Sequence, residues 1–294
     1  MERAVEFFSG GYRLAADLYG PDDVRSDERR PGVVLCCGYT GVKDVFLNDM
    51  GRRIAAGGFV ALTFDYKGWG KSDGPPLRLN PYGRVEDTRA ALTFLAMQPE
   101  VDAGRLGLYG ISYGGSVAAF AAAIDPRVQA LVSVTGVGDG ARWLRQVRRP
   151  WDYRELVERA SRDRERQVVS GRSESVHRDE ILAMDPRSAA MSAKIRASRP
   201  ATAMEVPLEM VHETIGFNPE WVVGRIAPRA SLFITSDEDE LVLPEESERM
   251  YRASGEPHKL VVLRGYGHYE VFYPPAIDEV MAETLAWYRR YLLD

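Results

Sequence analysis

A strand, a serine between two glycines and a helix follow one another near the middle of this chain of 294 residues. Residues 106–111 form a short apolar run, which is typical of a buried strand, and residues 116–124 are rich in alanine, which favours a helix. The pentapeptide Gly110-Ile-Ser-Tyr-Gly114 lies between them. A side chain at either end of so tight a turn would collide, so glycine is needed at both positions. Ser112 is therefore predicted to occupy a strained turn, with its hydroxyl raised above the edge of a sheet.

Apolar runs that alternate with helical segments predict the rest of the architecture. Continuous apolar runs are typical of strands buried on both faces of a parallel sheet. Such strands are expected at residues 33–37, 59–64, 106–111, 128–134, 230–235 and 259–263, after an opening hairpin over 5–19. Helices are expected at residues 47–56, 82–97, 116–124, 244–254 and 276–293. The alternation predicts an α/β fold with a mostly parallel central sheet flanked by helices.

The alternation breaks between residues 137 and 218, where helical spacing continues and strand signals are almost absent. Residues 139–199 hold 15 Lys and Arg against 10 Asp and Glu, although the formal net charge of the whole chain is −5. Such a change in composition is typical of an inserted element. We therefore expect a core made of residues 1–136 and 219–294, with residues 137–218 inserted as a helical cap over the strand ends.

Charge and cysteine content limit the classes of partner and compartment. The net charge of −5 argues against nucleic acid as a main partner. The first residues are too short and too charged for a signal peptide, and no apolar run reaches membrane-spanning length. Cys36 and Cys37 are adjacent, so an ordinary disulfide between them is not expected. We expect a cytoplasmic protein that acts on a small molecule, and Cys37 is interpreted as a buried apolar residue rather than a second nucleophile.

A serine hydroxyl needs a base to become a nucleophile, and the base needs an orienting partner. Among the four histidines, His268 follows the last apolar strand in a glycine-flanked loop, at the sheet edge where Ser112 should emerge. The acid is expected in the loop after strand 230–235. Asp239, which precedes Leu-Val and a helix-starting proline, is the first choice there, and Asp237 is the second. The sequence thus predicts a Ser112–His268–Asp239 triad.

Two further groups of residues are candidates for contact with a substrate. The backbone N–H of Tyr113 is expected to form one half of an oxyanion hole, and the loop at residues 38–40 the other half. In the cap, Trp143 could form part of an aromatic wall around the substrate, although packing within the cap is the first interpretation. Arg145 belongs to an arginine-rich stretch that could bind a carboxylate or simply form ion pairs with the acidic core. No metal or cofactor site is expected.

The chain resembles α/β-hydrolases over essentially its whole length. The order Ser112, Asp239, His268 matches the order of the family's triad. Residues 65–74, Asp-Tyr-Lys-Gly-Trp-Gly-Lys-Ser-Asp-Gly, resemble the family's D-x-R-G-x-G-x-S-x-G loop, with Lys67 in the arginine position. The resemblance implies an α/β-hydrolase fold with an inserted cap.

One branch of that superfamily is particularly similar. The tyrosine that follows the serine and the loop Gly38-Tyr-Thr-Gly41 resemble X-prolyl dipeptidyl-peptidases and cocaine esterases. In this branch a tyrosine hydroxyl helps to line the oxyanion hole, so the resemblance makes Tyr39 a candidate through its backbone or its hydroxyl. The chain departs from the family at Cys37-Gly38, where His-Gly is common.

The resemblance implies a cofactor-independent serine hydrolase that forms an acyl-enzyme. A carboxylic ester of a small or medium acid is the first expectation for its substrate. An amide or short peptide, and then the carbon–carbon bond of a diketone, are alternatives on the same triad, because a fold does not decide among them. A ligand-binding protein that has kept the triad without turnover is the alternative from another class. Homodimers are common in the family, and the sequence leaves the oligomeric state open.

Overall fold

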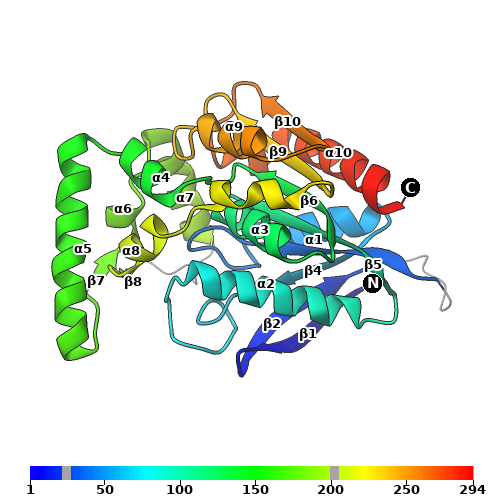
Figure 1. Ribbon diagram of the computed structural model, residues 1–294, viewed down its shortest axis with the longest axis horizontal. Helices are drawn as coiled ribbons and strands as arrows, with labels where there is room; N and C mark the ends of the chain where they lie inside the picture. The colour runs from blue at the N-terminus through cyan, green and yellow to red at the C-terminus, as the bar shows by residue number, and fades with distance from the viewer. Residues whose placement is uncertain (22–27, 199–204, 294) are drawn as a thin grey trace.

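The computed structural model describes residues 1–21, 28–198 and 205–293 and contains a central eight-stranded sheet within that part of the chain (Figure 1). The strand order is β1-β2-β4-β3-β5-β6-β9-β10, and every neighbouring pair from β4 to β10 is parallel. The strands are β1 (Glu2–Ser9), β2 (Tyr12–Tyr19), β3 (Arg30–Cys36), β4 (Val60–Phe64), β5 (Val101–Ile111), β6 (Val128–Val134), β9 (Ala230–Ser236) and β10 (His258–Leu263). The predicted mostly parallel α/β sheet is confirmed.

Helices cover both faces of this sheet (Figure 1). They are α1 (Leu47–Ala56), α2 (Pro81–Ala96), α3 (Tyr113–Ile124), α9 (Pro244–Ala253) and α10 (Ala276–Tyr288), with the short turns η1 (Pro219–Trp221), η2 (Val223–Ile226) and η3 (Glu270–Phe272). Helices α2 and α3 pack together on one side, and α1 and α10 pack together on the other. Because the sheet is covered on both sides, every residue of β4 and β9 is buried, as the continuous apolar runs predicted.

Several elements differ from their predicted bounds by one to three residues, and β5 and α10 differ most. Strand β5 begins at Val101 rather than Leu106, because residues 101 and 102 pair with the start of β3 before a shift in register. Residues 103 and 104 are exposed, so no apolar run marks this extension. Helix α10 ends at Tyr288, and Arg289–Leu293 continue as a π-helix, η4, instead of a regular α-helix.

The segment predicted as a cap, residues 137–218, follows β6 and precedes β9. Its helices are α4 (Gly140–Gln146), α5 (Pro150–Ser170), α6 (Arg178–Ile181), α7 (Pro186–Ser198) and α8 (Met210–Ile215). The segment also contains two short antiparallel strands that the sequence did not predict, β7 (Ser175–His177) and β8 (Glu205–Pro207). Residues 199–204 of the predicted cap lie outside the described residues. Helix α5 forms the outer edge of the molecule in Figure 1, away from the central sheet; we refer to the described part of residues 137–218 as the cap.

A buried ion pair connects the cap to the core. Arg142 of α4 donates to both carboxylate oxygens of Glu246 in α9, at 2.6 and 2.9 Å, and to Glu220 at 2.7 Å. The side chain of Glu246 is fully buried, and one of its oxygens also accepts the backbone N–H groups of Gly138 and Asp139. These bonds fix the start of the cap against α9.

Candidate active site

Ser112 lies at the turn between β5 and α3, in a backbone conformation that L-residues rarely adopt, with φ 52° and ψ −131°. Its two flanking glycines have no room for a side chain. A Cβ on Gly110 would lie 2.2 Å from the carbonyl oxygen of Gly114, and a Cβ on Gly114 would lie 2.2 Å from that of Cys36. The sharp turn predicted from the sequence is present, and it places the Ser112 hydroxyl at the N-terminus of α3.

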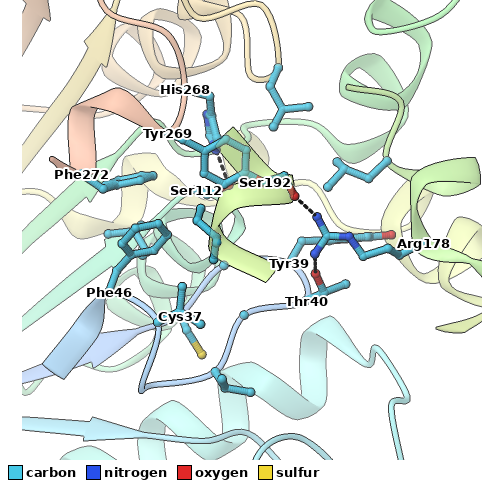
Figure 2. Close-up of a pocket in the computed structure, with 18 of the residues that line it drawn as sticks. Cys37, Tyr39, Thr40, Phe46, Ser112, Arg178, Ser192, His268, Tyr269 and Phe272 are labelled. Carbon is cyan, nitrogen blue, oxygen red and sulfur yellow. Dashed lines mark hydrogen bonds between the residues drawn. The ribbon is translucent and has the colours of Figure 1, made fainter. Parts of the chain in front are cut away.

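His268 lies beside Ser112 (Figure 2) and bonds to Asp239 on its other side. Its Nε2 is 3.0 Å from the Ser112 hydroxyl, and its Nδ1 is 2.7 Å from Oδ2 of Asp239. The three residues follow β5, β9 and β10, whose carboxyl ends lie at the same edge of the parallel sheet. Asp239 and His268 are almost completely buried, so the pair is shielded from water.

The two candidate acids have different surroundings. Oδ1 of Asp239 accepts the backbone N–H groups of Leu241 and Val242 at 3.0 and 2.8 Å, which leaves Oδ2 for His268. Asp237 instead accepts the N–H of Gly265 and a bond from Arg264, and these lower the pKa of its carboxyl. The structure therefore brings Asp239, and not Asp237, to the histidine.

Tyr39 and Tyr113 lie beside the serine in different ways. The N–H of Tyr113 is among the first N–H groups of α3, which have no carbonyl partner one turn earlier in the helix. The hydroxyl of Tyr39 lies 2.7 Å from that of Thr214, whose single proton is donated to the carbonyl of Met210. Tyr39 must therefore donate its own proton to Thr214. Burial raises the pKa of Tyr39 to about 12, so this proton stays in place at neutral pH.

The Ser112 hydroxyl faces a cavity of about 80 Å³ between the core and the cap (Figure 2). Its walls are mostly apolar and include Phe46 and Phe272 from the core and Leu182 from the cap. Trp143 also lines it, with its indole N–H donated to the carbonyl of Leu241 at 2.7 Å. Arg145 does not line this cavity and lies in a separate surface hollow. In the described part of the chain, no cluster of His, Cys, Asp or Glu could hold a metal ion.

Residues 10–269 match the family model of the X-Pro dipeptidyl-peptidases, family S15. The chain belongs to the S15 family. The chain is 25% identical to a thiohydrolase of Eupenicillium brefeldianum. The alignment covers 90% of this chain and 87% of the relative. It is 26% identical to the polyketide transferase claH of Penicillium crustosum, with 86% and 85% of the two chains covered.

Solved structures agree on the fold of the S15 chain. The α/β hydrolase GrgF from Penicillium sp. sh18 superposes with a TM-score of 0.84 over 100% of both chains, at 21% sequence identity. The predicted α/β-hydrolase fold is confirmed, and together with the family match it identifies the S15 chain as a hydrolase of this type. No described helix is both long enough and apolar enough to cross a membrane.

Sequence reasoning did not find a polar cluster in the cavity of this S15 hydrolase. Arg178 of α6 donates to the hydroxyls of Thr40 at 2.9 Å and Ser192 at 2.8 Å (Figure 2). Arg196 of α7 also lines the cavity. Arg178 and Thr40 are 138 positions apart in sequence, and no local pattern indicates that they meet.

Proposed function

We propose that this protein is a serine hydrolase that cleaves a carboxylic ester through an acyl-enzyme. The observation that carries the proposal is the position of His268, within hydrogen-bonding distance of Ser112 on one side and of Asp239 on the other. This is the geometry that a nucleophile, its general base and an orienting acid require. The strained turn at Ser112 is a second support, because such strain is typical of reactive positions.

In the proposed reaction, Ser112 attacks the acyl carbonyl while Nε2 of His268 takes the hydroxyl proton. Asp239 accepts a hydrogen bond from the N–H at Nδ1, which holds the imidazole in the required tautomer and stabilises its charged form. The backbone N–H of Tyr113 and that of Tyr39 donate to the oxyanion. His268 then passes its proton to the leaving alcohol, and a water molecule activated by the same nitrogen releases the acid.

The cavity favours a short acyl group. An apolar cavity of ~150 Å³ is large enough for benzene, and the cavity at Ser112 measures about 80 Å³. A few carbon atoms therefore fill it while the cap keeps the described position. We propose acids of about two to five carbons as the acyl part of the substrate.

A thioester is the second candidate, because the relatives named above include a thiohydrolase and a polyketide transferase. The same acyl-enzyme would form, with a thiol in place of the alcohol as the leaving group. Comparing kcat/KM for an oxygen ester and a thioester of the same acid decides between them. Cleavage of an amide or of a carbon–carbon bond is an alternative of lower rank. The rates with an anilide and with a diketone of similar size test these two alternatives.

Labelling with a fluorophosphonate tests the nucleophile. We expect one label per molecule of wild-type protein and none on Ser112→Ala, detected by mass spectrometry of the intact protein. The rate of ester hydrolysis should fall about a millionfold in this variant. Ser161→Ala, on the exposed surface of α5, is the matched control and should label like the wild type. Labelling of Ser112→Ala at the wild-type level, or no labelling of folded wild-type protein, would contradict the proposal.

A further inference from the structure

The polar cluster beside Ser112 consists of Arg178, Arg196, Ser192 and Thr40. Arg178 is only 6% exposed, and all three of its guanidinium nitrogens have partners. Two of these partners are the neutral hydroxyls of Thr40 and Ser192. A guanidinium carries five N–H groups, so two remain for another acceptor.

Ser192 indicates where that acceptor would sit. Its hydroxyl oxygen accepts from both Arg178 and Arg196, each at 2.8 Å. A hydroxyl oxygen has two acceptor lone pairs, so both are used and its own proton must be donated elsewhere. Arg178, Ser192 and Arg196 all line the cavity, so a ligand there would meet this polar cluster.

The charges around the cavity are unbalanced. Among the described lining residues, Arg178, Arg196 and His268 are the titratable bases, and none is an aspartate or glutamate. Asp179, which lies outside the lining, is 3.2 Å from Arg178 and 3.9 Å from Arg196. Among the described residues, one carboxylate is thus paired with two guanidinium groups, and a further negative charge would be favourable.

We infer that this cluster binds a carboxylate of the substrate, so that the preferred substrate is the monoester or monothioester of a short dicarboxylic acid. The inference rests on the proposed function of Ser112 and adds the substrate class. A carboxylate suits the site because it can accept two parallel bonds from a guanidinium. The spacer must be short, because the carboxylate and the ester carbonyl share one cavity of about 80 Å³.

The same charges disfavour a substrate with a free amino terminus. An ammonium group in this cavity would meet two guanidinium groups and, among the described lining residues, no carboxylate. Cleavage of a peptide near its free amino terminus is therefore not what this cavity favours, although the chain belongs to a family named for X-Pro dipeptidyl-peptidases.

The test compares the monomethyl esters of malonate, succinate, glutarate and adipate with the corresponding methyl ester amides, which replace the carboxylate by a neutral group of similar size. Methanol release gives kcat/KM for each. We expect the best monoester to exceed its amide by at least about tenfold in the wild type. In Arg178→Gln and Arg196→Gln this ratio should fall toward one. The exposed Arg162→Gln of α5 is the matched control and should keep the wild-type ratio.

A binding measurement keeps the test independent of turnover. Calorimetry with Ser112→Ala and the best monoester should show binding that weakens by about tenfold or more for the amide. A wild-type ratio near one, with neutral esters still hydrolysed, would overturn the carboxylate site alone. Failure of fluorophosphonate labelling and of all ester hydrolysis, with the monoester still bound preferentially, would instead overturn the proposed reaction. If Arg178→Gln does not fold, Arg196→Gln and Ser192→Ala are compared with the wild type instead. An unchanged ratio of kcat/KM between monoester and amide in both variants would count against the site.

Discussion

Asp239 uses its two oxygens for different partners, and an asparagine could replace only one of them. In Asp239→Asn the amide oxygen would accept from Leu241 and Val242, as Oδ1 does now. The NH2 group would then face Nδ1 of His268 and force the imidazole proton onto Nε2, where it could not accept the serine proton. We expect kcat to fall by ~10⁴ in a protein that remains folded, measured by ester hydrolysis and thermal unfolding.

Asp237→Asn is the control for this substitution. Asp237 is bonded to Arg264 and Gly265, which do not line the cavity at Ser112. We expect its kcat to stay within about threefold of the wild type, as for most surface changes away from special features. Similar losses of kcat in both variants would show that the negative charge of this loop supports the reaction, and not the hydrogen bond between Asp239 and His268.

Tyr39→Phe separates the two ways in which Tyr39 could stabilise an oxyanion. Because its hydroxyl proton is donated to Thr214, we expect kcat to change by less than about fivefold and the free energy of unfolding to fall by about 1 kcal/mol. A hydroxyl that donated to the oxyanion would cost ~10²–10³ in kcat when removed. A hundredfold loss of kcat, without loss of stability, would therefore assign the oxyanion role to the side chain.

At the residue scale, the sequence identified the site residues that closely follow a predicted strand. Ser112, Asp239 and His268 each follow an apolar run, so their shared edge follows from the topology. Arg178 has no such marker, because its position depends on how α6 packs against the loop after β3. Arg145 and its neighbours could be assigned to a helix, but the spacing alone did not indicate which of them faces the cavity.

At the scale of elements, the contact between α4 and α9 depends on Arg142. Replacement by alanine would leave the carboxylate of Glu246 buried without its counter-ion. We expect Arg142→Ala to lower the free energy of unfolding by ~3–5 kcal/mol, measured by denaturant titration. Arg145→Ala, on the exposed side of the same helix, should change it by less than about 0.5 kcal/mol. Alanine favours a helix at least as much as arginine does, so helix propensity cannot cause a loss. Equal effects of the two substitutions would therefore contradict a specific contribution of this ion pair.

Long periodic elements were predictable and short ones were not. Helix α1 occupies the predicted residues 47–56, since its apolar positions recur on one face and Gly57 follows it. Strands β7 and β8 have three residues each, too few for a pattern to emerge, and pair only because the chain folds back between them. The cap bounds of 137–218 stay a prediction.

At the scale of the whole molecule, the cap should set the length of the acyl group. Leu182 lines the cavity, whereas its neighbour Ile181 is also buried but lies outside the lining. Either change to alanine should cost ~2–5 kcal/mol of stability. Only Leu182→Ala should move the optimum of a p-nitrophenyl ester series toward longer acids, because only this change enlarges the cavity. The same shift in Ile181→Ala would show that the cap is loosened rather than the cavity enlarged.

The loop after β3 is bonded to the cap at two consecutive residues. Tyr39 bonds to Thr214 of α8, and Thr40 bonds to Arg178 of α6. The cap is therefore not an exchangeable module in this protein. A chimaera that received the cap of a relative would lose both partners of a loop next to Ser112, so its rate would change along with its selectivity. Transfer of specificity between relatives should succeed only when residues 39 and 40 are exchanged together with the cap residues that hold them.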